Sequence, residues 1–278
     1  MRKIKIVADS SSDIFNLEKV AYSVAPLKII TKDREFTDNG TLDVAQMVDY
    51  LKEYKGKSST SCPNYCDWLD TFGDAEEIFC VTVTGALSGS FNAAMMAKRT
   101  YEEQYPYKKV YVINTLSAGP ETALIVEKLG EFVKADLSFE QICEKIESYN
   151  KQTRLLFMLE SMRNLANNGR VSHLVAKMAG ILGIRLIGKA SDKGELEPIS
   201  KCRGEKMALE TIVENMTRLG FKGGKVHIAH CFNEKAAKEL AEKIKSVCKD
   251  VKIKLYSCKG LCSFYVEKGG ILIGFETA

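Results

Sequence analysis

No hydrophobic run in this sequence is long. The apolar segments have the length of single strands, and none approaches the ~20 residues that a membrane-spanning helix needs. Residues 1–7 (MRKIKIV) begin directly with an alternating strand pattern, so we expect no secretion signal and predict a cytoplasmic protein. The cysteines agree with this location, because nine of them, an odd number, lie scattered between Cys62 and Cys262, as is usual for reduced thiols.

The usual signatures of metal, nucleic-acid and nucleotide binding are also missing. Two cysteine pairs have C-x3-C spacing, whereas zinc sites prefer C-x2-C or C-x4-C pairs in glycine-rich turns, so we expect no metal. The 40 basic and 36 acidic residues are mixed along the chain and leave a net charge of +4 without a basic block, which does not indicate nucleic acid as a partner. There is no G-x-x-x-x-G-K-[ST] loop, so any ATP must come with a partner, and we expect no cofactor.

What the sequence contains is a regular alternation of strand-like and helix-like segments. At 278 residues it is long for one domain, and two domains are expected. In the first half the strand-like runs are residues 4–8, 24–30, 78–83 and 110–113, and the helical stretches are 44–54, 90–105, 121–134 and a capped helix after Ser138. Strands separated by helices favour a parallel sheet with right-handed crossovers.

The pattern changes after residues 150–153. The strand-like runs that follow are 184–188, 226–229, 251–256 and 271–275, with helices beyond Gly204 and from residue 233. These spacings predict a second α/β unit with a mixed sheet. The predicted fold class is therefore α/β, with an N-terminal parallel-sheet, Rossmann-like domain over residues 1–154 and a C-terminal mixed-sheet domain over residues 155–278.

Two clusters of hydroxyl side chains mark a candidate binding site. The first is Ser-Thr-Ser-Cys-Pro at 59–63, and the second is Gly-Ala-Leu-Ser-Gly-Ser-Phe at 85–91. Each lies beside a chain-bending residue and next to an apolar segment, so both can converge on one oxyanion without supplying a general base. This arrangement favours holding a carboxylate or phosphate over cleaving a bond.

Several segments, taken in order, resemble one family, the DegV proteins. The resemblance rests on the motifs ADSSSD at 8–13, VAPL at 24–27, TSCP at 60–63, LSGSF at 87–91, NGRVS at 168–172, KCRG at 201–204 and GGILIGF at 269–275. Each motif is weak alone, but in series they are specific, and they cover essentially the whole chain. The resemblance implies a two-domain protein that binds a long-chain fatty acid internally and presents its carboxylate to a separate, ATP-binding fatty acid kinase subunit. It also implies a carrier without catalysis of its own.

The resemblance also implies residue roles. Thr60, Ser59 and Ser88 fall on positions that resemble the family's carboxylate contacts, and Tyr265 stands where the family usually has a histidine. Hydroxyls suit this role, because a carboxylate withdrawn from water must be met by donors, and a phenol can donate one hydrogen bond without carrying charge. Arg170 and Arg203 match positions that engage the kinase partner or phosphate oxygens.

The acyl chain would need an apolar tunnel. Each methylene buried there contributes about 0.8 kcal/mol of favourable transfer free energy. We expect residues 174–182 and Ile184 to line it, although any one of these side chains can equally be ordinary core. No membrane-spanning segment is expected, and the hypothesis of a fatty acid carrier permits transient contact with a membrane surface.

Two other functions stay open from the sequence. An acyl-ester hydrolase would use Ser88 as nucleophile, but its flanks do not form a G-x-S-x-G elbow, and no histidine follows at a telling position. A carrier or sensor of a different lipid, with no kinase partner, is the second alternative. Serine and threonine also cap helices and turns more often than they bind ligands.

Overall fold

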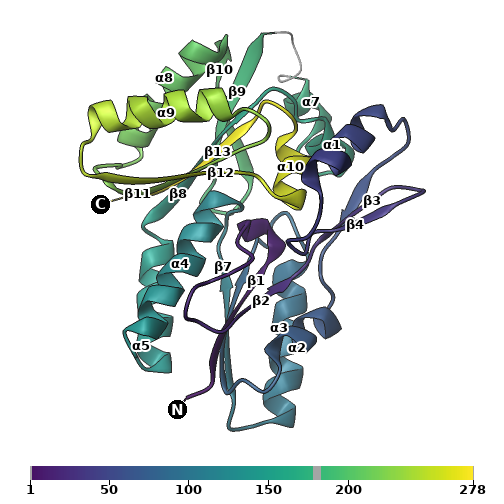
Figure 1. The fold of residues 1–278 in the computed structure, drawn as a ribbon, viewed down its shortest axis with the longest axis vertical. Helices are drawn as coiled ribbons and strands as arrows, with labels where there is room; N and C mark the ends of the chain where they lie inside the picture. The colour runs from purple at the N-terminus through teal and green to yellow at the C-terminus, as the bar shows by residue number, and fades with distance from the viewer. Residues whose placement is uncertain (1, 178–182, 278) are drawn as a thin grey trace.

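The computed structural model describes residues 2–177 and 183–277, and two large sheets organise it (Figure 1). The N-terminal sheet has four parallel strands in the order β2-β1-β6-β7. These strands are β1 Ile4–Asp9, β2 Tyr22–Ala25, β6 Glu77–Thr82 and β7 Lys109–Asn114. A short 3-10 helix, η1 Ser10–Ser12, follows β1 directly.

Helices cover both faces of this sheet, which is why its central strands are apolar on both sides. On one face lie α2 Tyr65–Phe72 and α3 Ser90–Gln104, whose buried side chains pack with Val7 and Ile78. On the other lie α4 Pro120–Lys134 and α5 Phe139–Asn150, packed against Ile6 and Phe79. Helix α5 begins at the capping box predicted from Ser138.

The C-terminal sheet has six strands in the order β10-β9-β8-β13-β11-β12. They are β8 Thr153–Leu159, β9 Ile184–Ala190, β10 Leu196–Arg203, β11 Gly224–His230, β12 Val251–Ser257 and β13 Ile271–Glu276. Only β11 and β12 pair in parallel among these described strands. Helices α8 Glu205–Arg218 and α9 Glu234–Val247 cover its outer face (Figure 1). The predicted fold class, a parallel sheet followed by a mixed sheet, is confirmed.

A third, three-stranded antiparallel sheet was not predicted. It consists of β3 Lys28–Ile30, β4 Glu35–Thr37 and β5 Ser59–Ser61 in the order β4-β3-β5, and α1 Val44–Glu53 lies between β4 and β5 in the chain. The sequence predicted one extended run over residues 24–30. That run is broken at Pro26, which has no N–H for a strand ladder, and the chain leaves the four-stranded sheet there to start the small one.

The small sheet holds a helix from the far end of the chain. Both carboxylate oxygens of Asp38, just after β4, accept backbone hydrogen bonds from the start of α10 Gly260–Val266: Gly260 N at 3.0 Å and Leu261 N at 2.9 Å. Gly260 allows this approach, because a Cβ there would lie 2.7 Å from Asp38 Oδ1. Burial raises the pKa of Asp38, and the two N–H donors oppose that rise. These contacts join segments that are 222 residues apart.

Helix α4 joins the two large sheets. Its Glu127 lies 3.3 Å from His227 Nε2 on β11 and 2.8 Å from Lys254 Nζ on β12. At Gly274 of β13 an added Cβ would lie 2.4 Å from the Pro120 carbonyl carbon, so the strand and the helix N-terminus meet at backbone distance. The chain passes from one large sheet to the other between α5 and β8, while the domain boundary after residue 154 stays a prediction.

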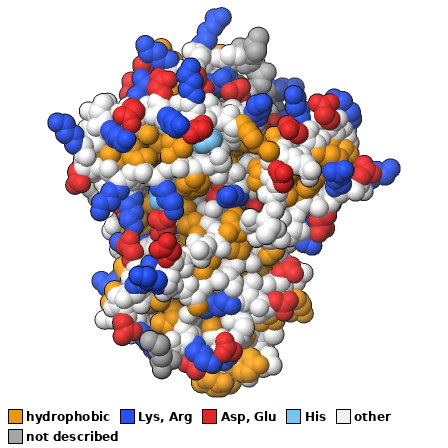
Figure 2. Space-filling view, in the orientation of Figure 1, with side chains coloured by type: hydrophobic (Ala, Val, Ile, Leu, Met, Phe, Trp, Pro, Cys, Tyr) orange, Lys and Arg blue, Asp and Glu red, His pale blue; other side chains and the backbone are white. Residues whose placement is uncertain are grey.

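The outer surface carries charges of both signs. In the face drawn in Figure 2, acidic and basic side chains are interspersed over most of the surface, with apolar side chains visible between them. No helix within residues 2–177 or 183–277 is long and apolar enough to cross a membrane.

Candidate functional site

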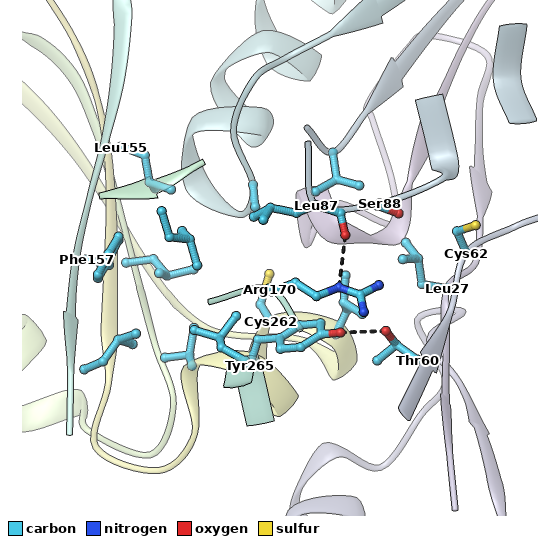
Figure 3. A pocket seen from close by; sticks show the side chains of 18 of the residues that line it. Leu27, Thr60, Cys62, Leu87, Ser88, Leu155, Phe157, Arg170, Cys262 and Tyr265 are labelled. Carbon is cyan, nitrogen blue, oxygen red and sulfur yellow. Dashed lines mark hydrogen bonds between the residues drawn. The ribbon is translucent and has the colours of Figure 1, made fainter. Parts of the chain in front are cut away.

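A cavity of about 330 Å³ lies between the two large sheets and α10 (Figure 3). Most of its wall is aliphatic or aromatic, and its polar side chains gather at one end. We call that end, formed by Thr60, Ser88, Arg170 and Tyr265, the head end, and the opposite end, around Leu155 and Phe157, the tail end (Figure 3). The remaining lining residues are Leu27, Ser61, Cys62, Val83, Leu87, Gly89, Ala118, Leu159, Leu165, Leu196, Leu261, Cys262, Val266 and Leu272.

Thr60 and Tyr265 form the first part of the head end. Their hydroxyl oxygens are 2.6 Å apart, so one donates to the other, although β5 and α10 are 205 residues apart in the chain. Whichever donates, the pair keeps one hydroxyl proton that it can offer to a third group. Burial raises the pKa of Tyr265, against the opposing effects of the Thr60 hydrogen bond and the Arg170 charge, so the phenol is neutral at physiological pH.

Ser88 supplies a second hydroxyl from the loop before α3. Its oxygen accepts a hydrogen bond from Ser90 N at 3.2 Å, which leaves its own proton free to donate. The loop is held by Asp9, whose Oδ2 accepts from Ser90 Oγ at 2.6 Å and from Val83 N at 2.9 Å. Asp9 is fully buried and does not line the cavity. The acidic and hydroxyl cluster after β1 therefore supports the site and does not form part of its wall.

Arg170 brings positive charge to the head end. Its Nε donates to Leu87 O at 3.1 Å, and its Nη1 donates to Asn168 O. The guanidinium is thus fixed between the Ser88 loop and Tyr265 (Figure 3), with further N–H donors available to a ligand. The sequence predicted that Arg170 faces a kinase partner or a phosphate, and the structure puts it in the cavity wall.

Two other predicted residues lie outside the wall. Arg203, at the end of β10, is exposed and is not among the lining residues, so its role toward a partner stays a prediction. Ser59 is opposite Ile30 in the small sheet, one residue before Thr60, and it does not line the cavity. Its carboxylate contact stays a prediction, while Ser61, on the other side of Thr60, is part of the lining.

The tail end comes from a strand that sequence reasoning had not assigned to the tunnel. Leu155, Phe157 and Leu159 alternate on β8 and face the cavity side of the sheet, whereas Leu156 and Met158 face α8 and α9. The predicted lining by residues 174–182 and Ile184 is not seen in its described part, where Leu174 is 77% exposed and Ile184 is absent from the wall. Residues 178–182 lie outside the described residues.

Among the side chains that the structure describes, the cavity wall holds no histidine or carboxylate that would activate Ser88 as a nucleophile. His227 and His230, the histidines whose side chains the structure describes, do not line the cavity. The thiol of Cys262 is buried in the wall, and burial raises its pKa well above the usual range, so it contributes a neutral surface. Within the described residues no group of three His, Cys, Asp or Glu side chains is arranged to hold a metal ion.

Together these features define an α/β protein with a cavity between its two large sheets, apolar over most of its wall and rich in hydrogen-bond donors at one end. The chain belongs to the DegV family: the family model, described as uncharacterised proteins of the DegV family, matches residues 3–277. A DegV domain-containing protein of Streptococcus pneumoniae is 41% identical over 276 residues, which are 98% of each chain. The resemblance inferred from the sequence motifs is thereby confirmed.

Solved structures of relatives contain fatty acids. A DegV family protein from Eubacterium eligens loaded with heptadecanoic acid has a TM-score of 0.97 and 43% identity, over 99% of this chain and 100% of that one. The Streptococcus pneumoniae Fatty Acid Kinase (Fak) B3 protein loaded with linoleic acid has a TM-score of 0.98 and 40% identity, over 100% of both chains. Both the fold and the nature of the ligand in these relatives match what the sequence predicted for the family.

Proposed function

We propose that this protein binds one long-chain fatty acid, with the carboxylate at the head end and the acyl chain along the apolar wall. The observation that carries the proposal is the asymmetry of the cavity: one end holds hydroxyls and a guanidinium, and the rest is hydrocarbon. The relatives loaded with heptadecanoic and linoleic acids support it, because both cover nearly the whole chain at 40% identity or more.

The head end can compensate for the desolvation of a carboxylate. A buried carboxylate without partners is too costly to hold, so each of its oxygens needs donors. Ser88 offers one hydroxyl proton, the Thr60–Tyr265 pair offers another, and Arg170 offers charge-assisted N–H groups. Each methylene of the tail adds about 0.8 kcal/mol of favourable transfer free energy, so the acyl chain supplies most of the affinity.

We further propose that the protein acts in the cytoplasm with a separate kinase subunit. The match to a protein named Fatty Acid Kinase (Fak) B3 supports this step. The ATP-binding subunit would phosphorylate the carboxylate held at the head end, and the carrier itself would supply binding and orientation. Arg170 next to the carboxylate and the exposed Arg203 would then offer positive charge to the phosphate or to the partner.

The first test is mass spectrometry of an organic extract from the purified, unsupplemented protein. We expect a near-stoichiometric long-chain fatty acid. An extract without fatty acid that stays empty after incubation with fatty acids would contradict the proposal. Recovery of a different lipid class would favour the alternative carrier. Acyl phosphate formation with a kinase subunit and ATP tests the second step, and binding without such formation would reject the partnership.

A double variant tests the site itself. Thr60→Val with Ser88→Ala removes two hydroxyls and leaves the apolar wall intact, so fatty acid affinity should fall at least roughly 100-fold, since hydrogen bonds to a charged group contribute about 1.5–3 kcal/mol each. The control is Thr217→Val with Ser246→Ala, the same chemical changes on exposed positions of α8 and α9. Equal affinities for both double variants would reject the carboxylate assignment.

A further inference from the structure

The tail end of the cavity is shaped by a pairing of an aromatic residue with a glycine. Phe157 on β8 lies directly opposite Gly188 on β9 in the antiparallel ladder. Phe157 is 1% exposed and lines the cavity, at the end farthest from Thr60 and Ser88 (Figure 3). The ring therefore has the cavity on one side and the backbone of β9 on the other.

Gly188 is what lets the ring lie back against the sheet. A Cβ at this position would lie 2.1 Å from Phe157 Cζ and 2.5 Å from Cε2, far inside van der Waals contact. The same Cβ would lie 2.7 Å from the Glu197 carbonyl oxygen on β10, so it has no room on its other side. Backbone atoms yield less readily than a rotatable side chain, and any side chain at 188 would push the ring toward the cavity.

We propose that Phe157 is the residue that limits acyl chain length, and that Gly188 sets the limit by giving its ring a recess in the sheet. This inference rests on the proposed fatty acid binding. It adds that the ligands which fit best are unbranched acids long enough to fill the cavity up to the Phe157 ring. Each added carbon of the ligand gains van der Waals contacts with the close-packed wall, but only until the end of the chain meets the Phe157 ring.

The recess has a direct consequence for selectivity. With the ring withdrawn, added methylenes raise affinity about fourfold each until the chain end meets Phe157. Beyond that length the tail must displace the ring or bend, and affinity falls. The leucines at 155 and 159 flank the ring on the same strand face and restrict its sideways movement.

The experiment is a titration of delipidated protein with the straight-chain saturated acids from dodecanoic to eicosanoic acid. Four variants are compared with the wild type: Phe157→Ala, Gly188→Ala, the double change Gly188→Ala with Phe157→Leu, and Met158→Leu. The last is the matched control, because Met158 is the next residue on β8 but packs on the opposite face of the sheet. Unfolding by urea gives the stability of each variant separately from its length profile.

We expect the preferred length to move in opposite directions in Phe157→Ala and in Gly188→Ala. Phe157→Ala should move the optimum roughly two to four carbons upward, because the ligand tail can fill the space that the ring leaves. Gly188→Ala should move it downward, and replacing the displaced ring with leucine should restore a profile close to that of the wild type. Met158→Leu should lower stability slightly and keep the wild-type optimum.

Three results separate the possible failures. A wild type that loads fatty acids, together with a Phe157→Ala variant of unchanged length profile, overturns the chain-length role alone. A wild type that takes none of the acids overturns the proposed function and this inference with it. If Gly188→Ala does not fold, Phe157→Ala and an additional single variant, Phe157→Leu, still decide, because a graded upward shift supports the role of the ring and equal optima reject it.

Discussion

The two ends of the cavity are built by different physical means. The head end consists of hydrogen-bond donors on short segments far apart in the chain: β5, the loop before α3, the segment after α6 Arg163–Asn167, and α10. The tail end consists of alternate apolar residues on the continuous strand β8, closed by Phe157 against β9. The head end therefore depends on how distant elements are held together, and the tail end depends on the shape of one sheet.

The support of the head end should be the more fragile of the two. Each of its donors is held by hydrogen bonds to another element, as Ser88 is through Ser90 and Asp9, and as α10 is through Asp38. Removing one partner from these buried hydrogen bonds leaves the other donor or acceptor unsatisfied. Shortening an apolar side chain at the tail end instead leaves a space that a ligand can fill.

The largest expected effect is at Asp38, because its removal would take away both side-chain acceptors at the start of α10. Asp38→Ala leaves Gly260 N and Leu261 N buried without their acceptor, and the free energy of unfolding should fall by about 4 kcal/mol. Asp38→Asn keeps one acceptor and should lose about half as much. Urea unfolding and fatty acid retention measure the two consequences.

The control for Asp38 is Asp43→Ala. Asp43 also caps a helix, accepting from Gln46 N at 2.9 Å at the start of α1, but it is exposed. Loss of such a cap typically costs about 1 kcal/mol. Equal losses in both variants would show that the head end needs no support from Asp38.

Next in size is the pH dependence expected from Glu121, a buried acid of α4 outside the cavity. Burial raises its pKa to about 7, against the hydrogen bond that Thr153 Oγ1 donates to Glu121 Oε1 at 2.9 Å. Between about pH 4.5 and 7 the native state keeps the proton that the unfolded chain loses, so the free energy of unfolding falls as pH rises through this range. The fall should approach about 3 kcal/mol.

Glu121→Gln keeps the acceptor for Thr153 and removes the titration. The variant should show a flatter stability profile from pH 4.5 to 7 in urea unfolding, with fatty acid affinity unchanged at either pH. If the variant keeps the pH dependence of unfolding seen in the wild type, a group other than Glu121 is responsible for it. A loss of fatty acid affinity in Glu121→Gln would contradict our assignment of Glu121 to a position outside the binding site.

Arg170 tests whether charge, beyond hydroxyl donation, matters at the head end. Arg170→Gln should lower affinity for a fatty acid about 30-fold, because a charge-assisted hydrogen bond contributes about 2 kcal/mol. Affinity for the fatty alcohol of the same length should change little, since it carries no charge. Isothermal titration with both ligands measures the difference, and equal losses for acid and alcohol would mean that Arg170 acts on the shape of the site alone.

The smallest effect is expected at Tyr265. Tyr265→Phe keeps the ring in the wall and removes the hydrogen bond to Thr60, which should lower fatty acid affinity about fivefold, or about 1 kcal/mol. Thr60 can then turn its own proton to the ligand, which is why the loss should be modest. In the Thr60→Val background the same change should have a larger effect, and a double-mutant cycle without coupling would contradict the paired arrangement.

The sequence predicted the two large sheets well and the cavity only in part. The alternation of strands and helices gave the α/β fold, and the family motifs pointed to Thr60, Ser88 and Tyr265, three of the four head-end side chains. Arg170 was predicted to face a kinase partner or a phosphate, and its motif carries no information about the Leu87 carbonyl that holds it in the cavity wall.

The missed parts have physical reasons. Helix α10 is buried on nearly all sides, so its sequence, GLCSFYV, has no polar face that would give a helical periodicity. The small sheet has strands of three residues, too short for a clear alternation. At the tail end, the apolar alternation on β8 marks a buried face, but hydrophobicity alone does not distinguish a filled core from a wall that faces a cavity.

The attachment of α10 to the small sheet also fixes the order of events during synthesis of the protein. Asp38 and Thr60 leave the ribosome early, and their partners on α10 follow only after 222 and 205 further residues. Segments so far apart close a long loop at entropic cost, and they meet late in folding. Until that helix docks, the head end lacks Tyr265 and the cavity lacks one wall. The inner strand β13 of the C-terminal sheet follows α10 in the chain, so a nascent chain could take up a ligand only after both α10 and β13 have been made.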